Sequence, residues 1–352
     1  MNVVMIVPTG LGCEIGGHAG DATPAAKLLA SVCDNLVVHP NVVNASDINE
    51  QTENMWYVEG GLLDEFLNGH TVLRKVRKPN RVFIAVNSPM RTETHNAINA
   101  SRVTLGADVM GFMLTTPLVM KATIEQNGTA GGTYSGHVEL IEQLKEYKND
   151  FDALAINTLI DCPRQMARDY FKRLHKVNPW GGIEAKMSRF VSTALHKPTA
   201  HAPIQPLEVM EEDVNKEWDF VCDPRMSPEI ISQCFLHCVI KGLHTAPRII
   251  AYKKRRPTDL TVDDIDLLVS PSGCWGLPHA ICHGRGIPVL AVKENSCIYG
   301  NYTPNDAIQI ENYWKAAGYI AALKAKVTPQ SVRRPLNVLG IWDNTSGKTT
   351  TK

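Results

Sequence analysis

The segment 267–295, LLVSPSGCWGLPHAICHGRGIPVLAVKEN, places a cysteine and a histidine where thiol chemistry could occur. An apolar run typical of a strand leads into a turn with Ser272 and Gly273, and Cys274 follows just before a short helix. Open α/β sheets hold catalytic groups at the carboxyl ends of strands, and a nearby helix N-terminus lowers a thiol pKa. We predict Cys274 as nucleophile or base, assisted or oriented by His279, with Ser272 and Gly273 binding substrate. The alternative is a buried structural cysteine.

A second candidate loop, PTGLGCEIGGHAGDATP at residues 8–24, joins the first apolar run to the first helical pattern. Its five glycines allow positive φ and close approach of backbone N–H groups to a ligand, and the following helix N-terminus favours an anion. The loop contains neither the dinucleotide fingerprint nor the P-loop sequence. We predict that its reactive side chains face Cys274 across a cleft and that its glycine amides hold substrate oxygens; a long structural turn is the alternative. The catalytic candidates are Cys13, His18 and Asp21, and the binding candidates are Gly12, Gly16 and Gly17.

Other polar loops follow apolar runs in the same way. In QNGTAGGTYSGH (126–137) we predict hydrogen bonds to substrate from Thr133 and Ser135, with a flexible hairpin or lid as the alternative. In VNPWGGIEAKMSRF (177–190) the glycine pair begins a helix and Glu184 lies in its first turn. We predict that Glu184 binds the ligand; the alternative is that its carboxylate only stabilises the helix dipole. Smaller candidates follow the predicted strands 35–39, 153–157 and 288–292. The predicted substrate-binding residues here are Gly181, Gly182, Glu184, Glu294 and Asn295, and the smaller candidates are His39, Asn41, Asn44, Asp161 and Cys162.

No cofactor is predicted. His279 and His283 are four residues apart, which is the spacing of half a zinc site, but the glutamate of HExxH is absent. Cys234, His237 and Cys238 lie in the apolar stretch ISQCFLHCVIKGL, where core packing is the better interpretation. Zinc therefore stays a minor alternative.

The elements that would position these loops alternate between short β-branched runs and helical patterns. This alternation predicts an α/β fold with mainly parallel sheets covered by helices, organised as two Rossmann-like lobes around a cleft. The proline-rich and charged segment Pro198–Trp218 suggests a linker or a lobe-crossing arm. We predict an N-terminal lobe over 1–200, a C-terminal lobe over 201–340 and a flexible tail over 341–352.

The composition excludes several classes of function. Lysine and arginine number 36, as do aspartate and glutamate, so the formal net charge is zero, unlike that of most nucleic-acid-binding proteins. No apolar stretch has the length of a membrane span, and the nine cysteines are scattered rather than arranged as a secreted disulfide framework. We expect a cytosolic protein with a small-molecule substrate of anionic character, no nucleic-acid or membrane partner, and compatibility with a homo-oligomer.

Several segments resemble a bacterial and cyanobacterial family that carries a domain of unknown function. They are PTGLGCEIGGHAGDATPAAKLLA, HPNVVNASDINE, NPWGGIEA, DPRMSPEIIS, KGLHTAPR and SGCWGLPHAICHGRGIPVLAVKEN. The resemblance implies one shared design for the glycine-rich loops but no reaction. SGCWGLPHA followed by GIPVLAV is also similar to the nucleotide-sugar lobe of two-lobed glycosyltransferases, and Cys13 with Cys274 is similar to the cysteine pair of cofactor-independent racemases.

Three hypotheses follow from these observations. The favoured one is a cofactor-independent, cysteine-dependent hydrolase, isomerase or lyase acting on a small anionic or amide-bearing substrate. The second is a glycosyltransferase-like enzyme whose glycine loops hold a nucleotide sugar. The third is a metabolite-binding protein without turnover. We favour the first because a thiol stands at the predicted strand end, whereas no nucleotide motif is complete.

Overall fold

The computed structural model describes residues 1–18, 21–44, 50–172, 177–204, 221–231, 235–336, 340–343 and 348–351. Gly20, Cys234 and most of the predicted lobe crossing lie outside the described residues. Within them the predicted α/β fold with mainly parallel sheets is confirmed.

The largest sheet is parallel throughout, with strand order β15-β14-β13-β1-β2-β3. Its central strand β1 is fully buried from Val3 to Met5, as expected for a parallel sheet covered on both faces. The strands are β1 (Asn2–Met5), β2 (Asn35–Val38), β3 (Met55–Tyr57), β13 (Leu267–Ser272), β14 (Val289–Ser296) and β15 (Ile308–Ile310).

Two pairs of helices cover this sheet, and alternate side chains of β1 reach each pair. Val3 and Met5 pack in the cluster that contains the buried side chains of α1 (Thr23–Ala30) and α12 (Tyr313–Lys324). Val4 packs with α3 (Gly60–Leu67) and α11 (Leu277–Gly284) on the other face. The period-two alternation of a strand thus divides the core between the two faces.

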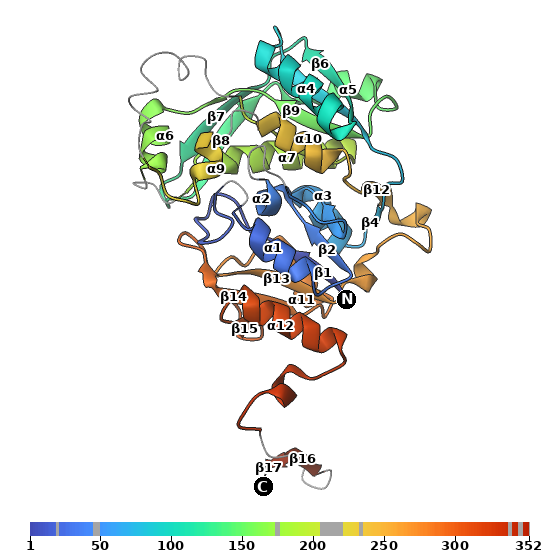
Figure 1. Ribbon diagram of the computed structural model, residues 1–352, viewed down its shortest axis with the longest axis vertical. Helices are drawn as coiled ribbons and strands as arrows, with labels where there is room; N and C mark the ends of the chain where they lie inside the picture. Colours follow the sequence, from blue (N-terminus) through green and yellow to red (C-terminus); the bar gives the residue numbers. More distant parts are fainter. Residues whose placement is uncertain are drawn as a thin grey trace.

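A second parallel sheet, with order β11-β9-β5-β6, lies above the first in Figure 1. It is formed by β5 (Arg81–Asn87), β6 (Asp108–Leu114), β9 (Ala153–Asn157) and β11 (Thr199–His201). One face packs with α4 (Thr92–Leu105) and α10 (Phe235–Leu243), the other with α5 (His137–Glu146) and α7 (Gly181–Leu195). A smaller sheet, β10-β7-β8, contains β7 (Val119–Ile124), β8 (Ala130–Ser135) and β10 (Ile160–Asp161), so the 126–137 segment forms part of a hairpin.

The chain passes between the two groups of elements beside the antiparallel pair β4 (Thr71–Arg74) and β12 (Arg248–Ala251). The six-stranded sheet takes strands from both sides of residue 200. The boundary predicted there stays a prediction. In the predicted tail, β16 (Gly340–Asp343) and β17 (Lys348–Thr351) form a hairpin away from the body of the molecule (Figure 1).

The remaining elements are short. They are α2 (Pro40–Val43), α6 (Arg164–Phe171), α9 (Ser227–Ile231) and the 3₁₀ turns Tyr252–Lys254, Val262–Asp264 and Pro329–Val332. Among the described helices, none has the length and apolar character needed to cross a membrane.

Candidate functional site

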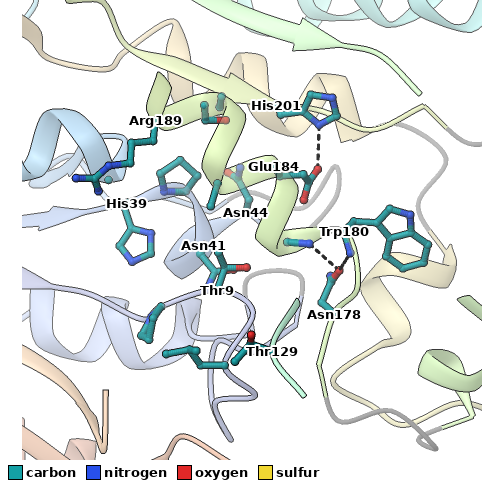
Figure 2. Close-up of a pocket in the computed structure, with 18 of the residues that line it drawn as sticks. Thr9, His39, Asn41, Asn44, Thr129, Asn178, Trp180, Glu184, Arg189 and His201 are labelled. Atoms are coloured by element: carbon teal, nitrogen blue, oxygen red, sulfur yellow. Dashed lines mark hydrogen bonds and ion pairs between the residues drawn. The ribbon is translucent and has the colours of Figure 1, made fainter. Parts of the chain in front are cut away.

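A cavity of about 1100 Å³ opens where the carboxyl ends of the two parallel sheets meet. Its lining includes residues that directly follow β1, β2, β3 and β13 from the larger sheet, and the end of β11 from the smaller one. Figure 2 shows side chains from both groups around this space, among them His39, Asn41, Glu184 and His201. Parallel α/β sheets place their ligands at strand carboxyl ends, so this cavity is the candidate site.

Three cysteines from three segments meet beside the cavity. Cys274 lines it and is 6% exposed. The Sγ atoms of Cys13 and Cys297 are 3.1 Å apart. The Cys274 thiol donates to the carbonyl oxygen of Pro271 at 3.1 Å, and Cys297 lies close enough to raise the pKa of Cys274. The glycine turns near both ends of the chain therefore come together, with Cys297 as the residue that joins them.

The three thiols differ in their pKa values. Hydrogen bonding within the cluster lowers the pKa of Cys297. The same hydrogen bonds, together with burial, raise the pKa values of Cys13 and Cys274. Cys297 is also the most exposed of the three, so it is the thiol of the cluster that ionises most readily.

His279 is placed to donate a hydrogen bond to Ser270, beside Cys274, rather than to take the Cys274 proton. The backbone N–H of Gly276 donates to His279 Nδ1 at 3.1 Å, which assigns the ring proton to Nε2. Nε2 lies 3.0 Å from Ser270 Oγ and 3.8 Å from Cys274 Sγ. Burial lowers the pKa of His279 to about 4, so the ring is neutral. Of the two predicted roles, base and orienting group, this geometry favours the second.

The remaining reactive residues of the first glycine loop hold that loop together. His18 is buried and its Nδ1 lies 2.7 Å from Tyr170 Oη. Asp21 Oδ1 accepts from Gly16 N–H at 2.5 Å, and burial raises the pKa of Asp21 to about 6. A Cβ on Gly17 would lie 2.2 Å from the carbonyl oxygen of Cys13, so glycine is required there for close packing. Among the described lining residues of the cavity, His18, Asp21 and these glycines are absent.

Two asparagines from other elements fix the same loop. Asn295 is completely buried and bonds both backbone groups of Ile15, with Ile15 N–H donating at 2.9 Å and Ile15 C=O accepting at 2.8 Å. Asn41 Nδ2 donates to the carbonyls of Val7 and Gly16, both at 2.9 Å. Asn295 thus acts on the loop that carries Cys13, and Asn41 lines the cavity as well.

The start of α7 closes another side of the cavity. Asn178 Oδ1 accepts from Trp180 and Gly181 N–H, and a Cβ on Gly181 would lie 2.2 Å from Thr9 Oγ1. A Cβ on Gly182 would lie 2.1 Å from the carbonyl oxygen of Ala130. The glycine pair therefore permits close contact between α7 and the other loops (Figure 2).

Glu184 projects from α7 and lies 3.0 Å from His201 Nδ1, whose Nε2 lies 3.0 Å from Thr158 Oγ1. Carboxylate, imidazole and hydroxyl form a line, but Thr158 is completely buried behind the histidine. This hydroxyl cannot reach a ligand. Glu184 and His201 both line the cavity, and Glu184, with a side chain 24% exposed, is the more accessible of the two.

The other predicted binding residues are distributed differently. Thr133 and Ser135 lie on β8, and the cavity is lined instead by Asn127 and Thr129 near the hairpin turn. Gly273 N–H donates to Thr303 Oγ1 at 2.7 Å, Ser272 accepts from Cys297 N–H, and Glu294 is exposed on β14. These four predicted residues, Thr133, Ser135, Ser272 and Glu294, lie outside the described lining, as does Gly273.

The two histidines of the zinc alternative have different partners. His279 faces Ser270, whereas His283 is exposed and pairs with Asp306 at 3.0 Å. In the part of the chain that the structure describes, no three His, Cys, Asp or Glu side chains form a group that could hold a metal ion.

Sequence reasoning missed Cys297 and His201. Cys297 comes two residues after Asn295 and directly follows β14, so the carboxyl-end rule that selected Asn295 would also have selected Cys297. His201 ends a three-residue strand inside a segment interpreted as a linker, and a strand that short leaves no periodic signal.

A sequence profile described as "Protein of unknown function (DUF3326)" matches residues 2–333. An uncharacterized lipoprotein from a Synechococcus species is 32% identical over 343 residues, which cover 94% of this chain and 92% of the relative. No solved structure matches the chain.

Proposed function

The chain belongs to the DUF3326 family, and we propose that its cavity is the active site of a cysteine-dependent enzyme acting on a small polar molecule. One observation carries the proposal. Cys274 is the cluster thiol that lines the cavity, and its neighbour Cys297 has a lowered pKa and can take up its proton. A cysteine sulfur in contact with a ligand-sized space, with a proton acceptor beside it, is what covalent thiol catalysis requires.

The cluster supplies a route for the proton. Cys274 passes its proton to Cys297 as its sulfur attacks the substrate, because its raised pKa disfavours a free thiolate, and negative charge develops on the sulfur that faces the cavity. His279 Nε2–H, 3.8 Å away, and the N-terminus of α11 then stabilise that charge. The Cys274 sulfur adds to a substrate carbonyl carbon, and the leaving group departs with the proton from Cys297. Water then breaks the C–S bond of the resulting thioester, which releases the acid and restores the Cys274 thiol.

The cavity lining favours a neutral or amide-bearing substrate over a simple anion. Among its described residues the carboxylates are Glu59, Asp64, Asp161, Glu184 and Glu229, and the guanidinium groups are Arg164 and Arg189. Arg189 pairs with Asp64 at 2.5 Å. Five asparagines also line the space and offer both donors and acceptors, which suits amide or hydroxyl groups.

The test uses a panel of small p-nitrophenyl esters and p-nitroanilides with the full chain. We expect release of the chromophore and, after acid quench, an acyl group on Cys274 located by peptide mass mapping. Cys274→Ser should lose turnover at least about 100-fold. Cys33→Ser is the matched control, because Cys33 is buried between α1 and β2 outside the cavity lining. Full turnover in Cys274→Ser, or acylation of another residue only, would refute the proposal.

The two other hypotheses predict different results. A glycosyltransferase-like site should be stabilised by a nucleoside diphosphate, by about 2.7 kcal/mol at 100 times the dissociation constant. A binding protein without turnover should be stabilised by its metabolite and should retain that shift in Cys274→Ser. Thermal-shift measurements on both proteins separate these outcomes.

Location and assembly stay predictions. The Synechococcus relative is named a lipoprotein, so detection of this chain in separated membrane and soluble fractions tests the cytosolic expectation. Sedimentation of the purified chain tests the homo-oligomer.

A further inference from the structure

We propose that Cys13 and Cys297 form a peroxide-reactive dithiol centre, in which Cys297 is oxidised first and Cys13 closes the disulfide. The regulatory part of this inference rests on the proposed function, whereas the oxidation itself does not.

The backbone around the two cysteines already has the geometry of a cross-strand disulfide. Cys13 and Cys297 form an isolated antiparallel bridge. Glu14 N–H donates to Ser296 C=O at 3.2 Å, and Ile298 N–H donates to Gly12 C=O at 3.1 Å. These flanking bonds make the cysteines a non-hydrogen-bonded pair, whose Cα atoms are about 4.5 Å apart. That separation lies within the range that disulfides span.

The side chains of Cys13 and Cys297 are also positioned for disulfide formation. Both cysteines are free thiols, and their Sγ atoms are 3.1 Å apart, so a small rotation about the side-chain bonds brings them to bonding distance. The pairing connects residues 284 positions apart in the chain. Asn295 and the backbone hydrogen bonds hold together the two loops that carry these cysteines. Cys13 Sγ therefore already lies beside Cys297 Sγ before any oxidation occurs.

The two sulfurs have different roles in the reaction. Cys297 is partly exposed, its Sγ lies 3.1 Å from that of Cys13, and its pKa is lowered, so it is the thiol that ionises and meets the oxidant. Cys13 is 2% exposed and keeps its proton. Susceptibility to peroxide follows thiolate character and exposure, which selects Cys297 as the attacking sulfur.

The chemistry balances with hydrogen peroxide as the oxidant. The Cys297 thiolate attacks one peroxide oxygen and the O–O bond breaks, giving a sulfenic acid and hydroxide. Cys13 then attacks the Cys297 sulfur, the S–O bond breaks, and the hydroxide that leaves takes the Cys13 proton to form water. Two electrons pass from the two sulfurs to the peroxide. A dithiol restores both thiols by exchange.

Formation of the Cys13–Cys297 disulfide removes the Cys297 thiolate, on which the proposed reaction depends. The proposed reaction passes the Cys274 proton to Cys297, and in the oxidised protein Cys297 is no longer a thiolate that can accept it. The oxidised chain should therefore lose turnover and recover it with dithiothreitol. Failure of the proposed function would abolish this activity readout but leave the disulfide itself measurable.

The experiment treats the full chain at pH 7 with hydrogen peroxide in slight excess, followed by alkylation and peptide mass mapping. We expect a Cys13–Cys297 linked peptide, with Cys274 alkylated. Cys162 is an internal comparison, because it is also partly exposed but its pKa is raised to about 12 by burial and Asp161. Cys297 should be oxidised at least about tenfold faster than Cys162.

Two variants separate the steps. In Cys13→Ser the oxidation should stop at the Cys297 sulfenic acid, which dimedone captures, and in Cys274→Ser the Cys13–Cys297 disulfide should still form. Oxidation of Cys162 as fast as Cys297, or a disulfide that joins Cys274 to Cys297 in the unmodified chain, would overturn the proposal. The measurement on the unmodified chain decides the case even where a variant fails to fold.

Discussion

Replacing Asn295 with alanine should detach the first glycine loop from the six-stranded sheet. The side chain makes three hydrogen bonds: it accepts from Ile15 N–H at 2.9 Å and donates to Ile15 C=O and Tyr313 Oη, both at 2.8 Å. At about 1 kcal/mol each, their loss lowers the free energy of unfolding by about 3 kcal/mol. For a chain of 352 residues this corresponds to a decrease in melting temperature of about 4 °C.

Thermal unfolding followed by circular dichroism measures this effect. Asn312→Ala is the matched control, because Asn312 is an asparagine with one such bond, accepting from Lys315 N–H at 3.0 Å as the N-cap of α12. The control should lose about 1 kcal/mol. Asn295→Ala should also slow formation of the Cys13–Cys297 disulfide, since the loop carrying Cys13 is released. Equal melting temperatures for the two variants would refute the assignment of Asn295 as the residue that fixes this loop.

Two further predictions concern the same loop. Gly17→Ala places a Cβ 2.2 Å from the Cys13 carbonyl oxygen and should lower the melting temperature, whereas Gly318→Ala on α12, where nothing lies within 4 Å, should raise it slightly; a harmless Gly17→Ala in the same scan would contradict the packing. Burial raises the pKa of Asp21 from 3.8 to about 6, so its contribution is complete below pH 3.8 and is lost as pH rises through 6. Asp21→Asn keeps an acceptor for Gly16 N–H, and urea unfolding at several pH values should show less loss of stability between pH 4 and 6 than in the unmodified chain; identical pH profiles would argue against a buried carboxyl.

The elements of the fold were accessible from the sequence because their signals are local. Short β-branched runs such as Asn2–Met5 alternate with helical patterns, and this alternation is produced by a parallel sheet covered on both faces. The hairpin β7–β8 was anticipated only as an alternative, since its glycines weaken the strand pattern. The strand β11 was not predicted, because three residues carry too little periodicity.

The site was predictable in part, for the same reason. The sequence indicated Cys274 because the strand, turn and helix that hold it are contiguous. It also indicated the glycine loop, but not which of its side chains would face inward. His18 is directed to Tyr170, a residue 152 positions away, and Asp21 is used within the loop, so both were assigned a cleft role from their chemistry alone.

What the sequence by itself determined is the alternation of elements, the positions of the glycine turns, and one thiol at the end of a strand. What only the tertiary structure decided is which groups meet there: Cys297 beside Cys13 and Cys274, His201 behind Glu184, and His279 with its proton directed toward Ser270. The physical reason is distance along the chain. Turn geometry depends on neighbouring residues, whereas burial, hydrogen-bond partners and the location of a charge depend on contacts between segments hundreds of residues apart.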